Sequence, residues 1–82
     1  MDDYLSTEEV AWVLDTSAES IRDRIRDGEI KGVRLPAGFR VPRAEVLRLA
    51  RERIETEAGR KLSERQLEKL IDEVITTNKR RD

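Results

Sequence analysis

Cysteine and histidine are both absent from this chain of 82 residues. Without cysteine it can form neither disulfides nor thiolate metal sites, and this absence is compatible with a reducing cytoplasm. Without histidine it lacks the commonest general base and the commonest metal ligand. The longest unbroken apolar run, residues 10–14, is far too short to span a bilayer. No nucleophile–base pair and no glycine-rich phosphate loop is present, so we expect no enzyme, no cofactor and no small-molecule substrate.

Charged side chains, by contrast, make up 43% of the chain and alternate in sign. The formal net charge is only −1, but it is unevenly distributed. The first 17 residues hold five acids and no base, whereas residues 18–50 hold eight arginines and lysines against five acids. The middle of the chain can therefore present a locally positive surface of modest strength. The length suffices for one small domain.

Capping signals predict two short helices in the first third of the chain. Ser6 and Glu9 have the spacing of a capping box, so a helix should begin near Thr7. Ser17 is a good N-cap for a second helix, which should end at Gly28 because glycine adopts the left-handed C′ conformation without a steric clash. The second helix has one narrow apolar stripe and leaves polar groups on its open side. Two short helices about three residues apart form a helix-turn-helix.

The next segment predicts a β-hairpin followed by a third helix. The hairpin should span residues 31–41, with its tip at residues 36–38, where a proline fixes φ and a glycine permits the turn. Pro42 then begins a third helix, since the missing amide costs nothing in a first turn. That helix should fade near Gly59.

A second capping box, formed by Ser63 and Gln66, predicts a C-terminal helix over residues 63–77. Its apolar residues fall on one amphipathic stripe: Leu67, Leu70, Ile71, Val74 and Ile75. This stripe must meet an apolar surface, either on the chain's own domain or on another copy. Trp12 also has two possible partners, because it lies off the apolar face of the first helix. It could pack under the C-terminal helix or form a subunit contact.

A series of residues in a fixed order resembles a known fold. The series consists of Tyr4-Leu-Ser6, Glu9-Val-Ala11, Leu14, Ser17, Ile21, Gly28-Glu-Ile30, Gly38-Phe-Arg-Val-Pro-Arg43 and Glu45-Val-Leu47. In order and spacing it resembles the winged helix-turn-helix of phage excisionases (recombination directionality factors), which also forms the DNA-binding part of MerR-type regulators. The resemblance covers about residues 4–50. It implies that the second helix enters the major groove and that the hairpin, called the wing, lies along the phosphate backbone or the minor groove.

The expected fold is therefore mostly α with a small β-hairpin. A winged helix-turn-helix (MerR/excisionase-like) should occupy residues 1–58. A C-terminal amphipathic helix within residues 59–82 should pack on this domain or on another subunit.

Eight residues are candidates for DNA binding. They are Ser17, Glu19, Ser20, Arg22 and Arg26 on the second helix, and Lys31, Arg34 and Arg40 on or beside the hairpin. An arginine can donate two hydrogen bonds to guanine O6 and N7, and a glutamate can accept one from the cytosine amino group. Arginines beside a glycine-bearing tip suit contacts to phosphate or to a narrow minor groove.

These residues also have interpretations that need no DNA. Arg22 and Arg26 could form ion pairs with Glu19 and Asp23 on the helix surface. Ser17 could act as a cap alone. The arginines of the hairpin could merely discourage edge-to-edge strand pairing.

Three functional hypotheses follow. The first is a sequence-specific DNA-binding and DNA-bending protein that, like an excisionase, controls the direction of site-specific recombination with an integrase. Its partners would be double-stranded DNA, further copies of itself on adjacent sites and a recombinase in the cytoplasm of a bacterial host, with no membrane involved. The second is a small transcription repressor that acts by occlusion. The third is a protein-interaction or antitoxin-like module whose acidic front half binds a basic protein.

Overall fold

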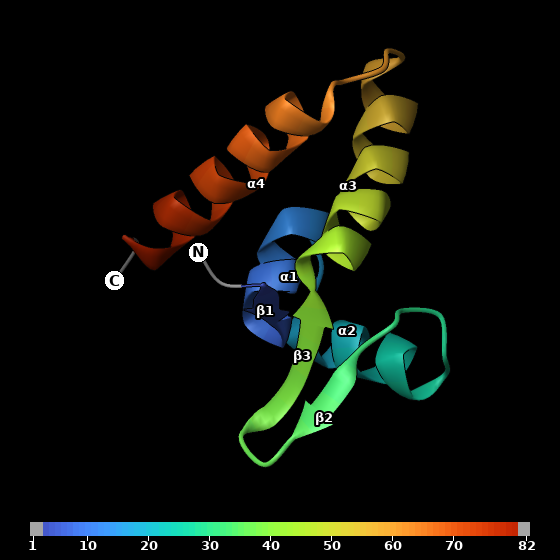
Figure 1. The fold of residues 1–82 in the computed structure, drawn as a ribbon, viewed down its shortest axis with the longest axis vertical. Coiled ribbons are helices and arrows are strands. Elements are labelled where there is room, and N and C mark those ends of the chain that lie inside the picture. The colour runs from blue at the N-terminus through green and yellow to red at the C-terminus, as the bar shows by residue number, and fades with distance from the viewer. Residues whose placement is uncertain (1–2, 81–82) are drawn as a thin grey trace.

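The structure is a computed structural model that describes residues 3–80. It is mostly helical, with four helices and a small antiparallel sheet, as predicted. The elements follow one another as β1 (Tyr4–Ser6), α1 (Thr7–Leu14), α2 (Ala18–Arg26), β2 (Val33–Leu35), β3 (Gly38–Pro42), α3 (Arg43–Ala58) and α4 (Glu64–Lys79) (Figure 1).

The two short helices begin at the caps that the sequence indicates. The Ser6 hydroxyl accepts from the Glu9 amide at 3.2 Å, while the Glu9 carboxylate accepts from the Ser6 amide at 2.9 Å. This capping box starts α1 at Thr7. In the same way the Ser17 hydroxyl accepts from the Ser20 amide at 3.1 Å and starts α2.

The end of α2 is a Schellman motif built on Gly28, whose φ is +82°. The Gly28 amide donates to the Ile25 carbonyl at 3.1 Å, and the Glu29 amide donates to the Arg24 carbonyl at 2.9 Å. The Glu29 carboxylate also accepts from the Arg24 guanidinium at 3.2 Å. These bonds fix where the chain leaves α2 and turns toward the hairpin.

The turn between α1 and α2 depends on Asp15, whose φ of +54° and ψ of +51° are left-handed. Asp15 is the only residue other than glycine with a positive φ within residues 3–80. Aspartate tolerates this conformation better than most residues because its short polar side chain can interact locally. The left-handed turn brings α2 across α1 as a helix-turn-helix requires.

The sheet has three strands in the order β1-β3-β2, so the hairpin is joined by an additional strand. β1 was not predicted. It pairs with β3 through the register of Leu5 with Val41, and both residues are buried. The hairpin begins later than predicted, because β2 starts at Val33. Its tip is a two-residue turn, Pro36 and Ala37, and Gly38 already belongs to β3. Pro42 is both the last residue of β3 and the N-cap of α3.

One hydrophobic core joins the helices and the sheet. Its members come from β1, α1, α2, β3, α3, α4 and the loop after α2. The largest side chains that are almost completely buried are Ile21, Ile30, Leu67, Ile71, Val10, Val41 and Val46. None of the helices in the described part of the chain has the length and apolarity needed to span a bilayer.

The C-terminal helix α4 lies against α1 and α3. Ile71 belongs to the core cluster and Ile75 packs against it, whereas Leu70 of the predicted stripe is 37% exposed and lies outside the core. The face of α4 that is buried against the domain is therefore narrower than the predicted apolar stripe. Trp12 on α1 is half-buried.

Two groups of ion pairs also hold α4 in place. Arg43, at the start of α3, donates to Asp72 at 2.7 Å and to Glu68 at 3.4 Å. Near the other end of α4, Lys79 lies 3.1 Å from Glu9 of α1. Arg43 therefore has a structural role in linking α3 to α4.

Candidate nucleic-acid interface

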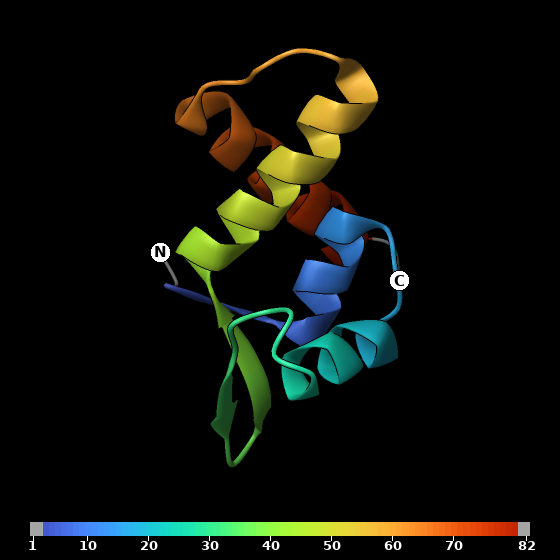
Figure 2. The ribbon, with the colours of Figure 1, turned by 90° about the vertical axis from the view of Figure 1, so that its right-hand side faces the viewer.

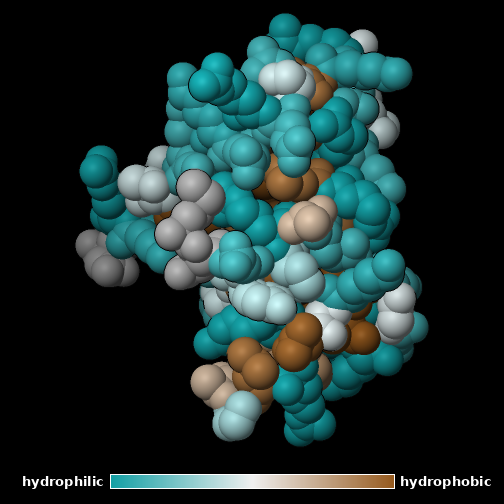
Figure 3. All heavy atoms as spheres, viewed as in Figure 1, coloured by the Kyte–Doolittle hydropathy of each residue, from teal (hydrophilic) through white to brown (hydrophobic). Residues whose placement is uncertain are grey.

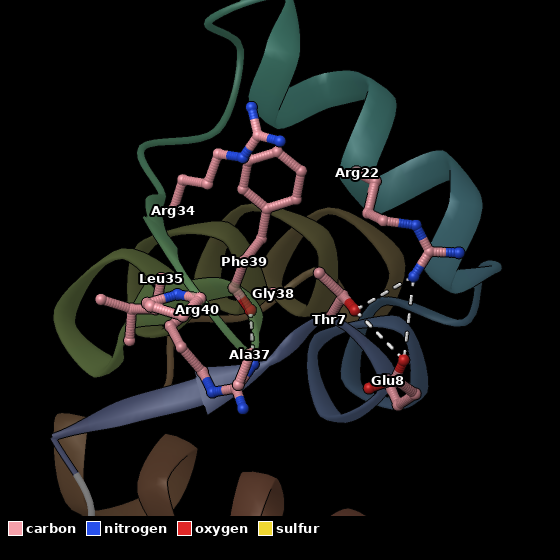
Figure 4. Close-up of a pocket in the computed structure, with 10 residues that line it drawn as sticks. Thr7, Glu8, Arg22, Arg34, Leu35, Ala37, Gly38, Phe39 and Arg40 are labelled. Carbon is pink, nitrogen blue, oxygen red and sulfur yellow. Dashed lines mark hydrogen bonds and ion pairs between the residues drawn. The ribbon is translucent and has the colours of Figure 1, made fainter.

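Helix α2 and the β2–β3 hairpin lie side by side at one end of the molecule, and the α3–α4 connection lies at the other end (Figures 1 and 2). Between them is a hollow of about 280 Å³. It is lined by Thr7 and Glu8 of α1, Arg22 of α2 and residues 34–40 of the hairpin (Figure 4). Three arginines and a single acid therefore surround one open concavity.

Arg22 turns toward the start of α1. Its Nη1 donates to the Thr7 hydroxyl at 3.4 Å and lies 3.8 Å from the Glu8 carboxylate (Figure 4). The predicted alternative of an Arg22–Glu19 pair was wrong, because the N-terminus of α1 offers acceptors beside α2. The Arg22 side chain is 38% exposed, and an exposed ion pair of this kind is weak, so the guanidinium can exchange partners at little cost.

Phe39 of β3 joins α2 to the hairpin. The Arg26 guanidinium carbon from α2 lies 5.7 Å from the centroid of the Phe39 ring, and that of Arg34 from β2 lies 6.0 Å from it. Both distances are within the range of cation–π attraction. Arg26 also forms an ion pair with Asp23 at 3.0 Å, which confirms one of the ion pairs predicted on the surface of this helix.

Sequence reasoning missed Phe39. The available signal was its position two residues before the buried Val41, which puts both side chains on the same face of β3. The opposite face carries Arg40, whose guanidinium donates to the Phe39 carbonyl at 2.8 Å. The hairpin thus presents Arg34 and Arg40 on its two faces.

The remaining candidates surround this end of the molecule without a common cluster. Ser17 and Glu19 are exposed at the start of α2, and the Ser20 amide is occupied by the cap. The Lys31 side chain is exposed in the loop before β2. The structure therefore brings Arg22, Arg34 and Arg40 around one hollow and leaves the other polar candidates along the outer surface of α2 and its loop.

Residues 4–54 match the family described as a helix-turn-helix domain. The chain belongs to this family. The match runs from β1 through most of α3 and leaves α4 outside it. No curated protein and no solved structure matches the chain significantly.

Membership of the helix-turn-helix family implies that the chain binds DNA. Proteins of this fold place their second helix in the major groove, and the corresponding helix here is α2. Within residues 3–80 there is no group of three or more acidic, cysteine or histidine residues that could hold a metal ion.

The loop between α2 and β2 is held by Glu45, a second residue that sequence reasoning missed. Glu45 lies in the first turn of α3 and is only 7% exposed. Its carboxylate accepts from the Lys31 amide at 2.9 Å and from the Arg48 guanidinium at 3.0 and 2.9 Å. The hydrogen bonds from Arg48 lower the pKa of Glu45, and the Lys31 amide adds to this effect against the opposing effect of burial. The helix-turn-helix domain thus fixes the base of its wing through an ionised carboxylate.

The lowered pKa predicts a pH-dependent contribution of Glu45 to stability. A group whose pKa falls on folding stabilises the fold above its unfolded pKa, about 4.3 for glutamate, and this contribution is lost as the pH falls through the folded value. We expect Glu45→Gln to lower the free energy of unfolding by about 1–3 kcal/mol at pH 7, because a charged hydrogen-bond acceptor is lost. The difference from the parent protein should shrink below about pH 4. Urea denaturation at several pH values measures it.

The matched control is Glu52→Gln. Glu52 lies on the same helix and also pairs with Arg48, at 3.1 Å, but its side chain is 67% exposed. Its replacement should change stability by about 0–1 kcal/mol. Equal pH dependence of the Glu45→Gln variant and the parent protein would contradict the role assigned to Glu45.

Proposed function

We propose that this protein is a sequence-specific DNA-binding and DNA-bending protein with an excisionase-like role. α2 would enter the major groove, and the β2–β3 wing would grip the phosphate backbone or the adjacent minor groove. The observation that carries the proposal is the arginine-lined hollow between α2 and the wing. Because arginines from both elements surround it, one stretch of duplex could contact both elements at once.

The proposed contacts divide by chemistry. Arg22 and Arg26 would read base edges, since a guanidinium can bind guanine with two hydrogen bonds. Glu19 and Ser20 would contact neighbouring bases from the same helix, and Ser17 would donate to a phosphate. On the other element, Lys31, Arg34 and Arg40 would bind the backbone or a narrow minor groove.

The modest charge favours an architectural role. Residues 18–50 carry a small excess of bases, so one copy would neutralise few phosphates and bind with moderate affinity. Several copies on adjacent sites would offset this weakness, and a bend shared among them would position an integrase. The resemblance of residues 4–50 to phage excisionases supports this role.

A small repressor is the second candidate. The observation in its favour is Leu70 on α4, which is 37% exposed and could form a contact between two subunits. A dimer formed through α4 would bind a palindromic site, with half-sites about one helical turn apart. Analytical ultracentrifugation that shows a dimer without DNA would favour the repressor, and a monomer that occupies adjacent sites cooperatively would favour the excisionase-like role.

Salt dependence tests the proposed function. We expect the protein to bind short duplexes at about 50 mM salt and more weakly at about 200 mM, because each neutralised phosphate adds about −0.9 to the slope of log K against log[salt]. Arg40→Ala should weaken binding to all duplexes alike and make this slope shallower by about 1. Gel-shift titrations at several salt concentrations measure both quantities.

The control for this titration is Arg60→Ala. Arg60 is exposed in the α3–α4 connection, at the end of the molecule away from α2 and the wing (Figure 1). Its loss should leave both affinity and slope unchanged. Failure of the parent protein to bind any duplex at low salt would overturn the proposal. If the protein then bound a basic protein instead, the hypothesis of a protein-interaction module would be favoured.

A further inference from the structure

The tip of the wing is apolar in a chain that is 43% charged. Leu35, Pro36 and Ala37 are all exposed, and Leu35 retains 45% of its accessible surface. Its cross-strand partner is Gly38, which has no side chain to cover it. Val33, two residues earlier on the same strand, shares this face and is 39% exposed. Val33 and Leu35 are two of the four large hydrophobic residues that remain exposed within residues 3–80.

The tip also projects from the body of the molecule. In both ribbon views the β2–β3 turn is the outermost point beyond α2 (Figures 1 and 2). The space-filling view shows hydrophobic spheres gathered at that end, amid hydrophilic surface (Figure 3). The tip can therefore reach into a partner before the rest of the domain does.

The charges around the tip select the chemistry of that partner. Arg34 precedes the tip and Arg40 follows it, and residues 33–41 contain no acid. An apolar wedge between two cations fits a surface on which stacked rings with apolar faces lie between two rows of anions. The minor groove of DNA is such a surface, since stacked bases lie between its two phosphate backbones.

We propose that Leu35, braced by Pro36, is a wedge that enters the minor groove and unstacks one base-pair step. This inference rests on the proposed function and supplies the origin of the proposed bend. Apolar side chains that insert in this way kink duplexes by about 20–90°. Leu35 would then favour flexible pyrimidine–purine steps without making any base-specific hydrogen bond.

A wedge must be rigid, and the wing is braced at its tip, its middle and its base. Pro36 fixes φ within the two-residue turn. Phe39 lies under guanidinium groups from both α2 and β2. At the base of the wing, the Lys31 amide is bound by the buried carboxylate of Glu45. These contacts connect the wing to α2 and α3 in the free protein.

The experiment uses the full chain and a duplex selected from a random-sequence pool. Fluorescence of 2-aminopurine, placed in turn at each step beside the major-groove contacts, reports unstacking, and energy transfer between dyes on the two duplex ends reports bending. With the parent protein we expect enhanced fluorescence at one step and a kink of about 20° or more. Leu35→Ala should abolish both signals while it changes affinity by less than about tenfold.

Two further variants control for folding and surface chemistry. Val33→Ala removes a comparably exposed apolar side chain from the same face but farther from the tip, and should leave both signals intact. Leu35→Phe restores a wedge and should restore unstacking. Because Leu35 is exposed, thermal denaturation of Leu35→Ala should match that of the parent protein.

Other results would overturn the wedge. Unstacking that persists in Leu35→Ala would do so, as would binding by the parent protein without unstacking, and both would leave the proposed DNA contacts standing. If Leu35→Ala instead lost only the occupation of adjacent sites, the tip would be a contact between copies and the wedge would again be excluded. Absence of binding to any duplex at low salt would refute the proposed function itself.

Discussion

Replacement of Ile71 by alanine should lower the free energy of unfolding by about 2–5 kcal/mol. Ile71 is 1% exposed and belongs to the core cluster, although α4 lies outside the segment that matches the helix-turn-helix family. Loss of its side chain would leave a cavity between α4 and the domain. Small domains are stable by only about 5–15 kcal/mol, so a large part of the total would be lost. Urea denaturation followed by circular dichroism measures the change.

The neighbouring Leu70→Ala variant is the matched control. Leu70 lies on the same helix but is 37% exposed, so its loss should cost about 1 kcal/mol or less. A small effect of Ile71→Ala would contradict the packing of α4 against its own domain. A concentration-dependent loss for Leu70→Ala would instead point to a subunit contact.

Arg22→Ala should relax base preference at one position of the binding site, with a loss of about 1–3 kcal/mol of discrimination. In the free protein Arg22 contacts Thr7 and Glu8, and release from these exposed contacts costs little. Its removal should also leave the fold intact, because the Thr7 hydroxyl can still donate to Glu8. Competition binding with every single base-pair variant of a selected site measures the discrimination.

Arg24→Ala provides the comparison on the same helix. Arg24 pairs with Glu29 and lines a different hollow, together with Leu49 and Arg53. Its replacement should leave base preference unchanged. If Arg24→Ala and Arg22→Ala altered preference equally, the assignment of Arg22 to a base edge would be wrong.

Features that depend on neighbours in sequence were predictable. The caps at Ser6, Ser17 and Ser63 each act through residues three positions away, so the starts of α1, α2 and α4 follow from local spacing. The left-handed backbone conformation of Gly28 was also predictable, because glycine is preferred at the position that follows the end of a helix. The order of helices and hairpin was correct for the same reason.

Features that depend on distant segments were not predictable. β1 has three residues and forms only by pairing with β3, which lies more than thirty positions away. Glu45 has the spacing of an ordinary surface acid, and only the return of the α2–β2 loop past α3 buries its carboxylate. The pairing of Arg22 with Glu8 and the cation–π contacts of Phe39 likewise require α1, α2 and the hairpin to be placed in space.

The ring of Phe39 also affects the entropy of binding. A free arginine side chain loses about 2 kcal/mol of rotamer entropy when it is fixed. The ring of Phe39 contacts the guanidinium groups of Arg26 and Arg34 in the free protein. We expect these contacts to reduce the side-chain entropy that the two arginines lose on association with DNA, relative to two freely rotating arginines.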